Sequence, residues 1–374
     1  MTTRYIATVS AICVLQAAGL AGCAGSSLSK IDHSETLPQD VITQDYSKKF
    51  EVQEASSSSA AAPTPVAQTV EIPAPLSKKT RKHREWKRTE EQKIRDVALA
   101  EIGPRQHKPL VYRDLRRDIR NGKDPIWVGE RLTYDVSYLG LTAATFVLEV
   151  LPYKSIDGRK VYHIQANARS SKVFSLVYKL NDVVQSFIDY EGVFSHRFHM
   201  QLDETKQIRD SLELYDSENE EAFWWNRWNR KEKGYEEKKE FHLMEPFPQD
   251  SISVLYYLRF VPLPPNGEVK FVVESEAKPL DAVVTVVERE ELETPMGRIH
   301  AIKLKPDAAT RGVLERRGNS YIWLSDDDRR FLVRFEAKVK IGTIVVRLRK
   351  IELGTPPDQL RGDAAPIPVE SIKQ

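Results

Sequence analysis

The chain has 374 residues with a net charge of +2, 41% hydrophobic residues and only two cysteines. The net charge excludes no class of partner, and the length allows two or three domains. Two cysteines exclude a disulfide-rich scaffold, so the fold has to be stabilised by burial of an apolar core.

The first 22 residues have the pattern of an export signal. Arg4 precedes an apolar run from Ile6 to Leu20, which is too short to span a bilayer comfortably. The run ends in Leu20-Ala21-Gly22-Cys23, which resembles the lipobox of bacterial lipoproteins. We therefore expect cleavage before Cys23 and a membrane anchor made by acyl chains on that residue. An ordinary secretory signal that happens to contain a cysteine is the alternative.

The residues after the lipobox indicate where the protein is sorted. Ala24-Gly25-Ser26 contains no aspartate beside Cys23, and such an aspartate is the inner-membrane retention signal in enteric-type sorting. We expect the outer membrane, with the protein facing the periplasm. Export also removes the chain from nucleic acid, which is therefore not an expected partner.

Two segments precede the predicted globular domain. Residues 23–77 are rich in serine, alanine and proline, so we expect a disordered linker. Residues 78–126 are a basic, partly helical connector. We interpret it as a contact for anionic lipid, lipopolysaccharide or a cell-wall polymer, with a solvated linker helix as the alternative. The candidate contact residues are Lys78, Lys79, Arg81, Lys82 and Arg84.

Residues 127–353 change to the period-two alternation of half-buried strands. Leu132, Tyr134 and Val136 alternate with polar residues, and the pair Asp157-Gly158 predicts a hairpin turn. We predict a mainly β fold in which a large antiparallel, strongly curved or barrel-like sheet carries one short helix. Residues 354–374 are a predicted disordered tail. Further strands are expected at 146–150, 161–168, 183–189, 194–202, 208–215, 221–228, 268–275, 282–289, 298–305, 319–324, 331–339 and 343–352.

The one predicted helix of this domain spans Asp250 to Phe260. Asp250 is a plausible N-cap, and Pro262 follows the last turn. The apolar positions that should face the sheet are Val254, Leu255 and Leu258. A sheet of about a dozen strands must curl, so a helix can plug its interior.

Five segments, in this order and spacing, resemble the landmarks of the domain-of-unknown-function family 3108, over about residues 127–353. Members of that family are typically exported bacterial proteins with an antiparallel, β-rich domain, and no activity is established for the family. The resemblance therefore implies an architecture and a compartment, but no reaction. The segments are Gly129–Val136, Asp250–Arg259, Glu293–Gly297, Trp323–Asp327 and Gly342–Ile344.

Ligand-binding candidates come from the helix and from an aromatic segment. We expect Tyr256, Tyr257 and Arg259 to lie where the plug meets solvent, since tyrosine and arginine together bind phosphate or carboxylate headgroups. The alternative is that the helix completes the core and Arg259 pairs with a surface acid. Trp225 follows Trp224, so on a regular strand one of these rings is expected to be exposed for sugar or lipid. The alternative is that these rings fill the core.

No motif of an enzyme is present. The chain lacks Gly-x-Ser-x-Gly, and an acylated Cys23 has no free thiol. On a regular strand His196 and His199 point to opposite faces and could not share an ion without a bulge or turn, so we expect no metal site. Because no catalytic constellation is recognisable, we also expect no cofactor and no catalysis. We predict a non-catalytic binding or assembly module for an amphipathic ligand, a glycan or an envelope protein. An enzyme that processes envelope glycan or lipid and a structural link between membrane and wall remain alternatives.

Overall fold

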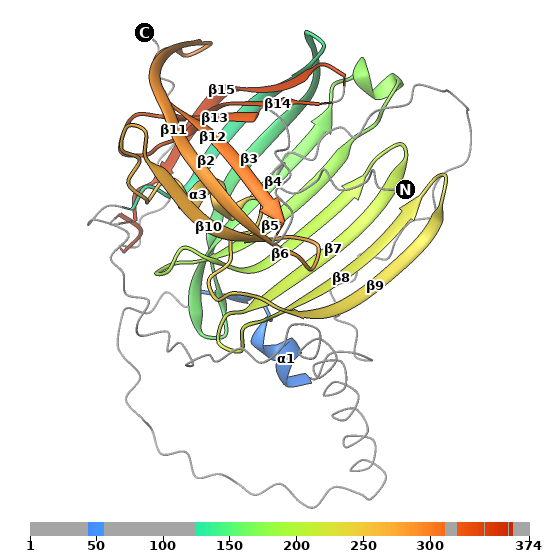
Figure 1. The fold of residues 1–374 in the computed structure, drawn as a ribbon. Coiled ribbons are helices and arrows are strands. Elements are labelled where there is room, and N and C mark those ends of the chain that lie inside the picture. Colours follow the sequence, from blue (N-terminus) through green and yellow to red (C-terminus); the bar gives the residue numbers. More distant parts are fainter. Residues whose placement is uncertain (1–43, 56–123, 311–319, 340, 358, 362–374) are drawn as a thin grey trace, which may run out of the picture.

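The computed structural model describes residues 44–55, 124–310, 320–339, 341–357 and 359–361, and these form one 15-stranded antiparallel sheet with few helices (Figure 1). The strand order is β10-β11-β12-β13-β14-β15-β2-β3-β4-β5-β6-β7-β8-β9, and β1 pairs with β3 outside this order. The predicted mainly β, strongly curved fold is therefore confirmed.

The strands are β1 (Gln53–Glu54), β2 (Val128–Tyr138), β3 (Leu141–Ile156), β4 (Arg159–Ser170), β5 (Asn181–Asp189), β6 (Ser195–Asp203), β7 (Gln207–Asp216), β8 (Glu221–Arg230), β9 (Gly234–Leu243), β10 (Glu268–Glu274), β11 (Pro279–Thr294), β12 (Gly297–Thr310), β13 (Ser320–Ser325), β14 (Leu332–Lys338) and β15 (Thr343–Thr355). The helical segments are α1 (Gln44–Lys49), η2 (Phe174–Leu176), α3 (Ser253–Tyr257) and η3 (Gln359–Arg361).

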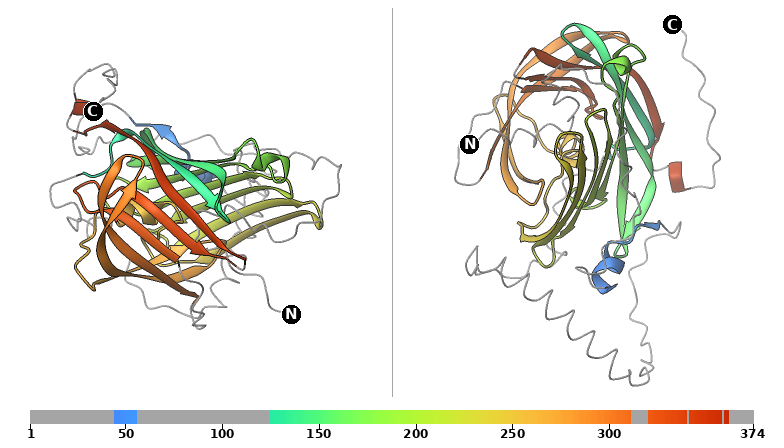
Figure 2. Two further views of the ribbon diagram at one scale, coloured as in Figure 1. Left: turned by 90° about the horizontal axis from the view of Figure 1, so that it is seen from above. Right: turned by 90° about the vertical axis from the view of Figure 1, so that its right-hand side faces the viewer.

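The sheet curls strongly but does not close by strand pairing, because its edge strands β9 and β10 are not hydrogen-bonded neighbours (Figure 2). Residues 248–249 connect β6 with β10 instead. The Pro248 carbonyl accepts a hydrogen bond from Ser195 N–H at 2.9 Å, and Gln249 N–H donates to the Val272 carbonyl at 2.9 Å. These backbone bonds fix the curvature at the place where the chain enters α3.

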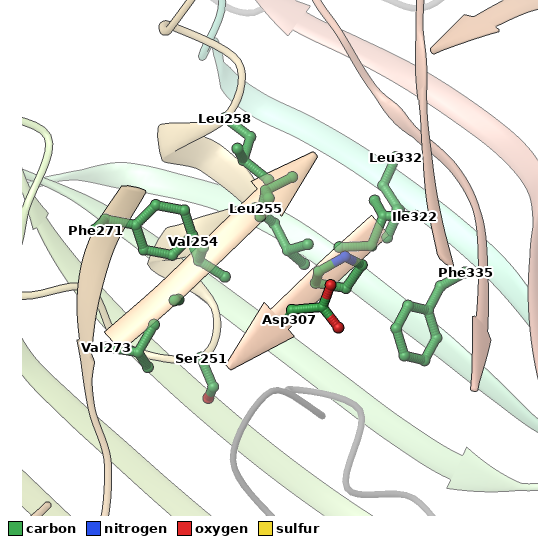
Figure 3. Close-up of a pocket in the computed structure, with 13 residues that line it drawn as sticks. Ser251, Val254, Leu255, Leu258, Phe271, Val273, Asp307, Ile322, Leu332 and Phe335 are labelled. Atoms are coloured by element: carbon green, nitrogen blue, oxygen red, sulfur yellow. The ribbon is translucent and has the colours of Figure 1, made fainter. Parts of the chain in front are cut away.

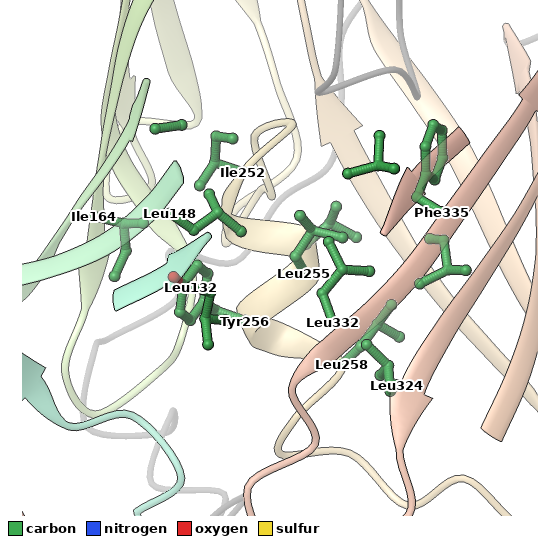
Figure 4. Packing of buried hydrophobic residues seen from close by; sticks show 14 of the residues in the cluster. Leu132, Leu148, Ile164, Ile252, Leu255, Tyr256, Leu258, Leu324, Leu332 and Phe335 are labelled. Carbon is green, nitrogen blue, oxygen red and sulfur yellow. The ribbon is translucent and has the colours of Figure 1, made fainter. Parts of the chain in front are cut away.

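Helix α3 lies inside the curl, between the walls of the sheet. Leu255 of α3 and Leu258, which directly follows it, pack among Leu148 of β3 on one side and Leu332 and Phe335 of β14 on the other (Figure 4). All belong to the largest cluster of buried apolar side chains, which fills the concave side of the sheet. The predicted plug and its inward-facing stripe are therefore found, but the helix covers only Ser253–Tyr257 instead of the predicted Asp250 to Phe260, with turns on either side.

A second apolar cluster lies on the opposite face of the sheet and is covered by α1. Tyr46 of α1 and Phe50, which follows it, pack against Phe223, Trp225 and Phe241. Phe50 is 1% exposed, and Lys49 Nζ bonds Asp216 at 2.9 Å. The prediction of disorder throughout residues 23–77 is thus wrong for the helix and strand of 44–54. A few aromatic residues bury enough apolar surface to order this stretch despite the polar composition around it.

The charged edge strand β9 was not among the strands predicted from the sequence. Its charged side chains hide the period-two pattern, since the only apolar side chain that it buries is Phe241. At the other boundary, β15 continues to Thr355 and η3 follows, so the predicted tail of 354–374 starts with ordered residues. Within the described ranges no helix combines the length and apolar character needed to cross a bilayer.

Several predictions lie outside the described residues. These are the signal over 1–22, the acylated Cys23, and the basic contact residues between Lys78 and Arg84.

Candidate ligand site between helix α3 and the sheet

Asp250 caps the turn that leads into α3, while the N-cap position of the helix itself is Ile252, two residues beyond the predicted one. Its Oδ1 accepts the backbone N–H groups of Ile252 and Ser253, each at 2.7 Å, and Ser253 Oγ accepts the N–H of Asp250 at 2.7 Å. This reciprocal pattern satisfies donors that a helix start leaves unpaired. Asp250 Oδ2 accepts hydrogen bonds from Ser186 and Ser195 of the sheet, at 2.6 and 2.5 Å. The cap therefore also attaches the helix to β5 and β6.

A narrow apolar cleft runs between α3 and strands β10 to β14 (Figure 3). Its volume is about 580 Å³ when the space open to solvent is included, but the centre of a water molecule can occupy only about 30 Å³ of it. Most of its lining consists of aliphatic and aromatic side chains. The described lining residues are Ser251, Val254, Leu255, Leu258, Phe271, Val273, Ala282, Val284, Pro306, Asp307, Ile322, Leu332 and Phe335.

Polar groups are confined to few positions of this cleft. Asp307 is exposed, and its carboxylate lies 3.3 Å from Lys305 Nζ. Phe271 is only partly buried and contacts the ring of Tyr257, with ring centroids 5.6 Å apart. Tyr257 is therefore beside the cleft, next to the aromatic ring that lines it.

Arg259 is not at a solvent-facing edge, and its predicted placement is wrong. Its side chain is 3% exposed and forms a bidentate pair with the fully buried Glu130 of β2, at 2.7 and 2.8 Å. Its Nε donates to the Arg329 carbonyl at 2.7 Å, and its Nη2 also donates to the Pro125 carbonyl. These acceptors occupy the donors that a headgroup needs. Sequence spacing gave no signal for this pairing, because the partners are 129 residues apart.

Tyr256 is also buried, with 2% of its surface exposed, and it points into the core rather than to solvent. Burial raises the pKa of its hydroxyl, and the nearby Glu130 carboxylate acts in the same direction. Of the three candidates on the helix, only Tyr257 remains partly accessible. The cleft residues that the sequence did not single out include Phe271 and Phe335, because strand alternation marks them as ordinary core positions.

Neither tryptophan of the aromatic segment is exposed, which corrects the expectation for this pair. Trp224 and Trp225 are each 7% exposed, on opposite faces of β8. Trp225 belongs to the cluster beneath α1, donates its indole N–H to Glu237 at 2.8 Å, and is covered by the Arg227 guanidinium 4.2 Å from the ring centroid. The alternative of core rings shielded by long side chains describes these residues.

Parts of three of the five segments that carried the family resemblance meet at one end of the sheet, whereas Gly342–Ile344 lies at the β14–β15 turn of the other end. Glu130 accepts hydrogen bonds from both Arg259 and Arg329, the latter at 2.5 Å. In the loop between β13 and β14, Asp327 Oδ1 accepts the N–H groups of Arg329 and Arg330 at 2.9 and 2.8 Å. These landmarks thus build a structural network below the helix, outside the apolar cleft.

Other buried ionisable groups pair within the sheet. His196 bonds Asp189 at 2.9 Å and His199 bonds Asp210 at 3.0 Å, both on the convex side. A β-bulge in the pairing of β5 with β6 interrupts the alternation between these positions, so the expectation that the two rings point to opposite faces is wrong. On the concave side, burial raises the pKa of Glu213 to about 8. Among the residues that the structure describes, no three histidine, cysteine or acidic residues are grouped as a metal site would require.

Fold and cleft together define an all-β protein with an open, strongly curved sheet whose interior is plugged by a short helix. The chain belongs to the family described as protein of unknown function (DUF3108), whose family model matches residues 133–349. This match confirms the resemblance carried by the landmark segments. No curated protein matches the sequence.

The solved structures that match this chain share little sequence with it. A β-barrel-like protein of the domain of unknown function DUF1849 from Brucella abortus has 11% identity and a TM-score of 0.38, covering 60% of this chain and 98% of its own. A protein from Bacteroides fragilis, described as exported with a YmcC-like fold, has 12% identity and a TM-score of 0.28, covering 60% and 95%. A protein from Parabacteroides distasonis, described as a lipoprotein, has 11% identity and a TM-score of 0.29, with the same coverage.

Proposed function

We propose that this protein is a lipid-anchored envelope protein whose β-domain binds the apolar chain of an amphipathic molecule, without chemical conversion, in the cleft between α3 and β10 to β14. The observation that carries the proposal is the lining of the cleft. Leu255, Phe271 and Phe335 face a common space, while charge is confined to Asp307 (Figure 3). A dry apolar wall with few polar groups is typical of sites for apolar ligands.

The cleft is too narrow in this conformation to hold an acyl chain, so the proposed function requires the cleft to open. About 30 Å³ is far below the roughly 300 Å³ at the low end of ligand pockets, so an acyl chain has to widen the cleft. Phe271 is the side chain best placed to move, since it is only partly buried and belongs to the edge strand β10. Displacing one ring at an edge costs less than separating α3, whose Asp250 cap is bonded to two strands.

The lining favours an amphipathic ligand over a glycan, and it favours binding over the conversion of a substrate. A glycan requires many hydrogen-bonding groups, whereas the described wall is almost entirely apolar. Hydrolysis of glycosidic bonds normally uses a pair of carboxyl groups. The described lining contributes one carboxyl group, that of Asp307. Binding without reaction is therefore the better supported role.

Titration of the protein with dansyl-labelled undecanoic acid tests the proposal. We expect saturable binding to the parent, with competition by a lysophospholipid but not by a soluble peptidoglycan fragment. Ala282→Phe fills the cleft from β11 and should weaken binding at least tenfold, since a displaced apolar chain loses well over 1.4 kcal/mol. Leu353→Ala, at an exposed apolar residue outside the lining, is the matched control. Saturable binding that Ala282→Phe leaves unchanged, while the variant stays folded, contradicts the site.

The anchor and the compartment are a separate part of the proposal. The lipobox at Cys23 supports acylation, and the sequence after it supports the outer membrane, with the protein facing the periplasm. Metabolic labelling with a radioactive fatty acid should mark the parent and leave Cys23→Ser unlabelled. Equal labelling of both chains contradicts acylation at Cys23, and recovery of the labelled parent with inner membranes contradicts the sorting.

A further inference from the structure

Exposed apolar side chains gather at one end of the sheet, on three neighbouring connections. The β14–β15 turn carries Ile341, the β2–β3 turn carries Leu139 and Leu141, and the β4–β5 loop carries a third group. The strands joined by these connections are neighbours in the strand order, and the views in Figures 1 and 2 show the three connections on the same side of the molecule. We call this set the apolar rim: Leu139, Leu141, Val173, Leu176, Val177 and Ile341.

Hydrogen bonds hold the three connections that carry the apolar rim next to one another. Tyr138 Oη donates to the Ile341 carbonyl at 3.0 Å, which joins the first two turns. Ser171 N–H donates to the Ala143 carbonyl at 2.8 Å, which joins the β4–β5 loop to β3. The apolar side chains of the rim are largely exposed to solvent: Leu176 is 87% exposed, Val173 79% and Leu141 71%. A contiguous exposed apolar patch marks an interaction surface.

Lysines lie at the same end of the molecule, next to the apolar rim. The β4–β5 loop contributes Lys172 and Lys179. The β6–β7 turn contributes Lys206, and the β8–β9 turn contributes Lys231 and Lys233. Backbone bonds link these connections: Thr205 N–H to the Lys179 carbonyl, and Lys231 N–H to the Lys206 carbonyl, each at 3.0 Å. Lys179 pairs with Asp203, and Glu232 is the exposed acid among the others. Positive charge therefore exceeds negative charge here.

Exposed acids gather in the turns at the opposite end of the strands. They include Asp157, Glu191 and Glu218, together with the run Asp326–Asp328. Helix α1, through which the N-terminal chain joins the sheet, is also at this acidic end, where Lys49 bonds Asp216. Apolar rim and lysines are thus at the end of the molecule remote from α1.

From this arrangement we infer that the apolar rim docks on a bilayer containing anionic phospholipid. The aliphatic side chains enter the acyl boundary, and the adjacent lysines bind the phosphate groups, which is how interfacial segments divide apolar and basic residues. Charge complementarity favours a membrane, since a soluble protein partner gives no reason for separate apolar and lysine sectors. The contact is additional to an acyl anchor, because the rim lies away from the end that α1 occupies.

A fluorescent probe at the rim tests the inference directly. The full chain has two cysteines, so replacing both with serine allows one NBD label at Leu176→Cys. On mixing with phosphatidylethanolamine–phosphatidylglycerol vesicles, we expect the emission to shift to the blue and to become shielded from aqueous quenchers. The same label at Leu353→Cys, on an exposed leucine at the other end of the strands, is the control and should not respond. Vesicles of phosphatidylcholine alone should give a weaker response at 176.

A second arm tests the lysines. In the labelled chain, Lys172→Gln with Lys233→Gln should weaken partition into the anionic vesicles about 30-fold. This follows from about 1 kcal/mol, or about fivefold, for each lysine near the surface. Lys270→Gln with Arg298→Gln removes the same charge elsewhere on the exposed surface and should change partition less than threefold. The inference is overturned by an unshifted spectrum at 176, by equal shifts at 176 and 353, or by equal effects of the two charge pairs.

Discussion

The ion-pair network around Glu130 predicts how much stability the fold loses when this carboxylate is removed. Glu130 is fully buried and accepts hydrogen bonds from Arg259 and Arg329, of which Arg259 is itself 3% exposed. In Glu130→Leu both guanidinium groups lose their carboxylate. The side chain of Arg329 is 12% exposed and can turn to water, but Arg259 remains a buried, unpaired charge. Breaking such a pair on one side costs about 3–5 kcal/mol.

Urea unfolding followed by circular dichroism measures this cost. With an m value of about 3 kcal/mol/M, the midpoint should fall by about 1 to 1.7 M. The exposed pair of Glu293 with Arg298 provides the control, and Glu293→Gln should change stability by less than about 0.5 kcal/mol.

The double variant Glu130→Leu with Arg259→Met separates the burial of charge from the loss of packing. It removes both members of the pair, so we expect it to be more stable than Glu130→Leu alone, by about 2 kcal/mol or more. A loss below 1 kcal/mol for Glu130→Leu, or a double variant that is less stable than the single one, refutes this reasoning.

Three further predictions concern pH and the N-terminal segment. Burial raises the pKa of Glu213 from 4.5 to about 8, so the folded chain keeps a proton that the unfolded chain releases. Stability should therefore fall as the pH rises through this range, and it should fall less steeply in Glu213→Gln. Melting curves recorded between pH 5 and 8 measure this difference. Burial lowers the pKa of His163 from 6.5 to about 4, so stability should also fall as pH drops from 6.5 to 4; His163→Phe should remove this acid-side loss, and a parallel pH profile in the variant contradicts the assignment. Phe50→Ala should cost about 3–5 kcal/mol in urea unfolding, since its ring is buried under α1, and an unchanged midpoint contradicts that packing.

Local patterns predicted the elements whose determinants lie close together in sequence. Alternation located β2, and Asp157-Gly158 predicted a turn in which both residues adopt positive φ, at 51° and 70°. Asp250 was recognised as the residue that organises the start of α3, although the N-cap is Ile252, because its carboxylate bonds backbone groups only two or three positions away. The inward stripe of α3 was likewise given by helical spacing.

Features that depend on distant partners could not be predicted in this way. The burial of Arg259 depends on Glu130, which the fold brings to it from a strand far away in sequence. The order of Tyr46 and Phe50 depends on a cluster formed by β8 and β9, whereas their own neighbours in sequence are polar. The cleft was expected only as an interior beside the helix, and its aromatic walls, Phe271 and Phe335, come from two strands that sequence alone does not place opposite each other.

The location of a bound acyl chain is the most direct test of the proposed function. Crystals grown with 12-bromododecanoic acid allow the bromine to be found by anomalous scattering. We predict a bromine peak in the cleft between Leu255 of α3 and Phe335 of β14, with Phe271 displaced from its present position. Bromine bound only elsewhere on the protein, or no bound bromine at a ligand concentration that saturates the dansyl-probe site, contradicts an apolar ligand site in this cleft.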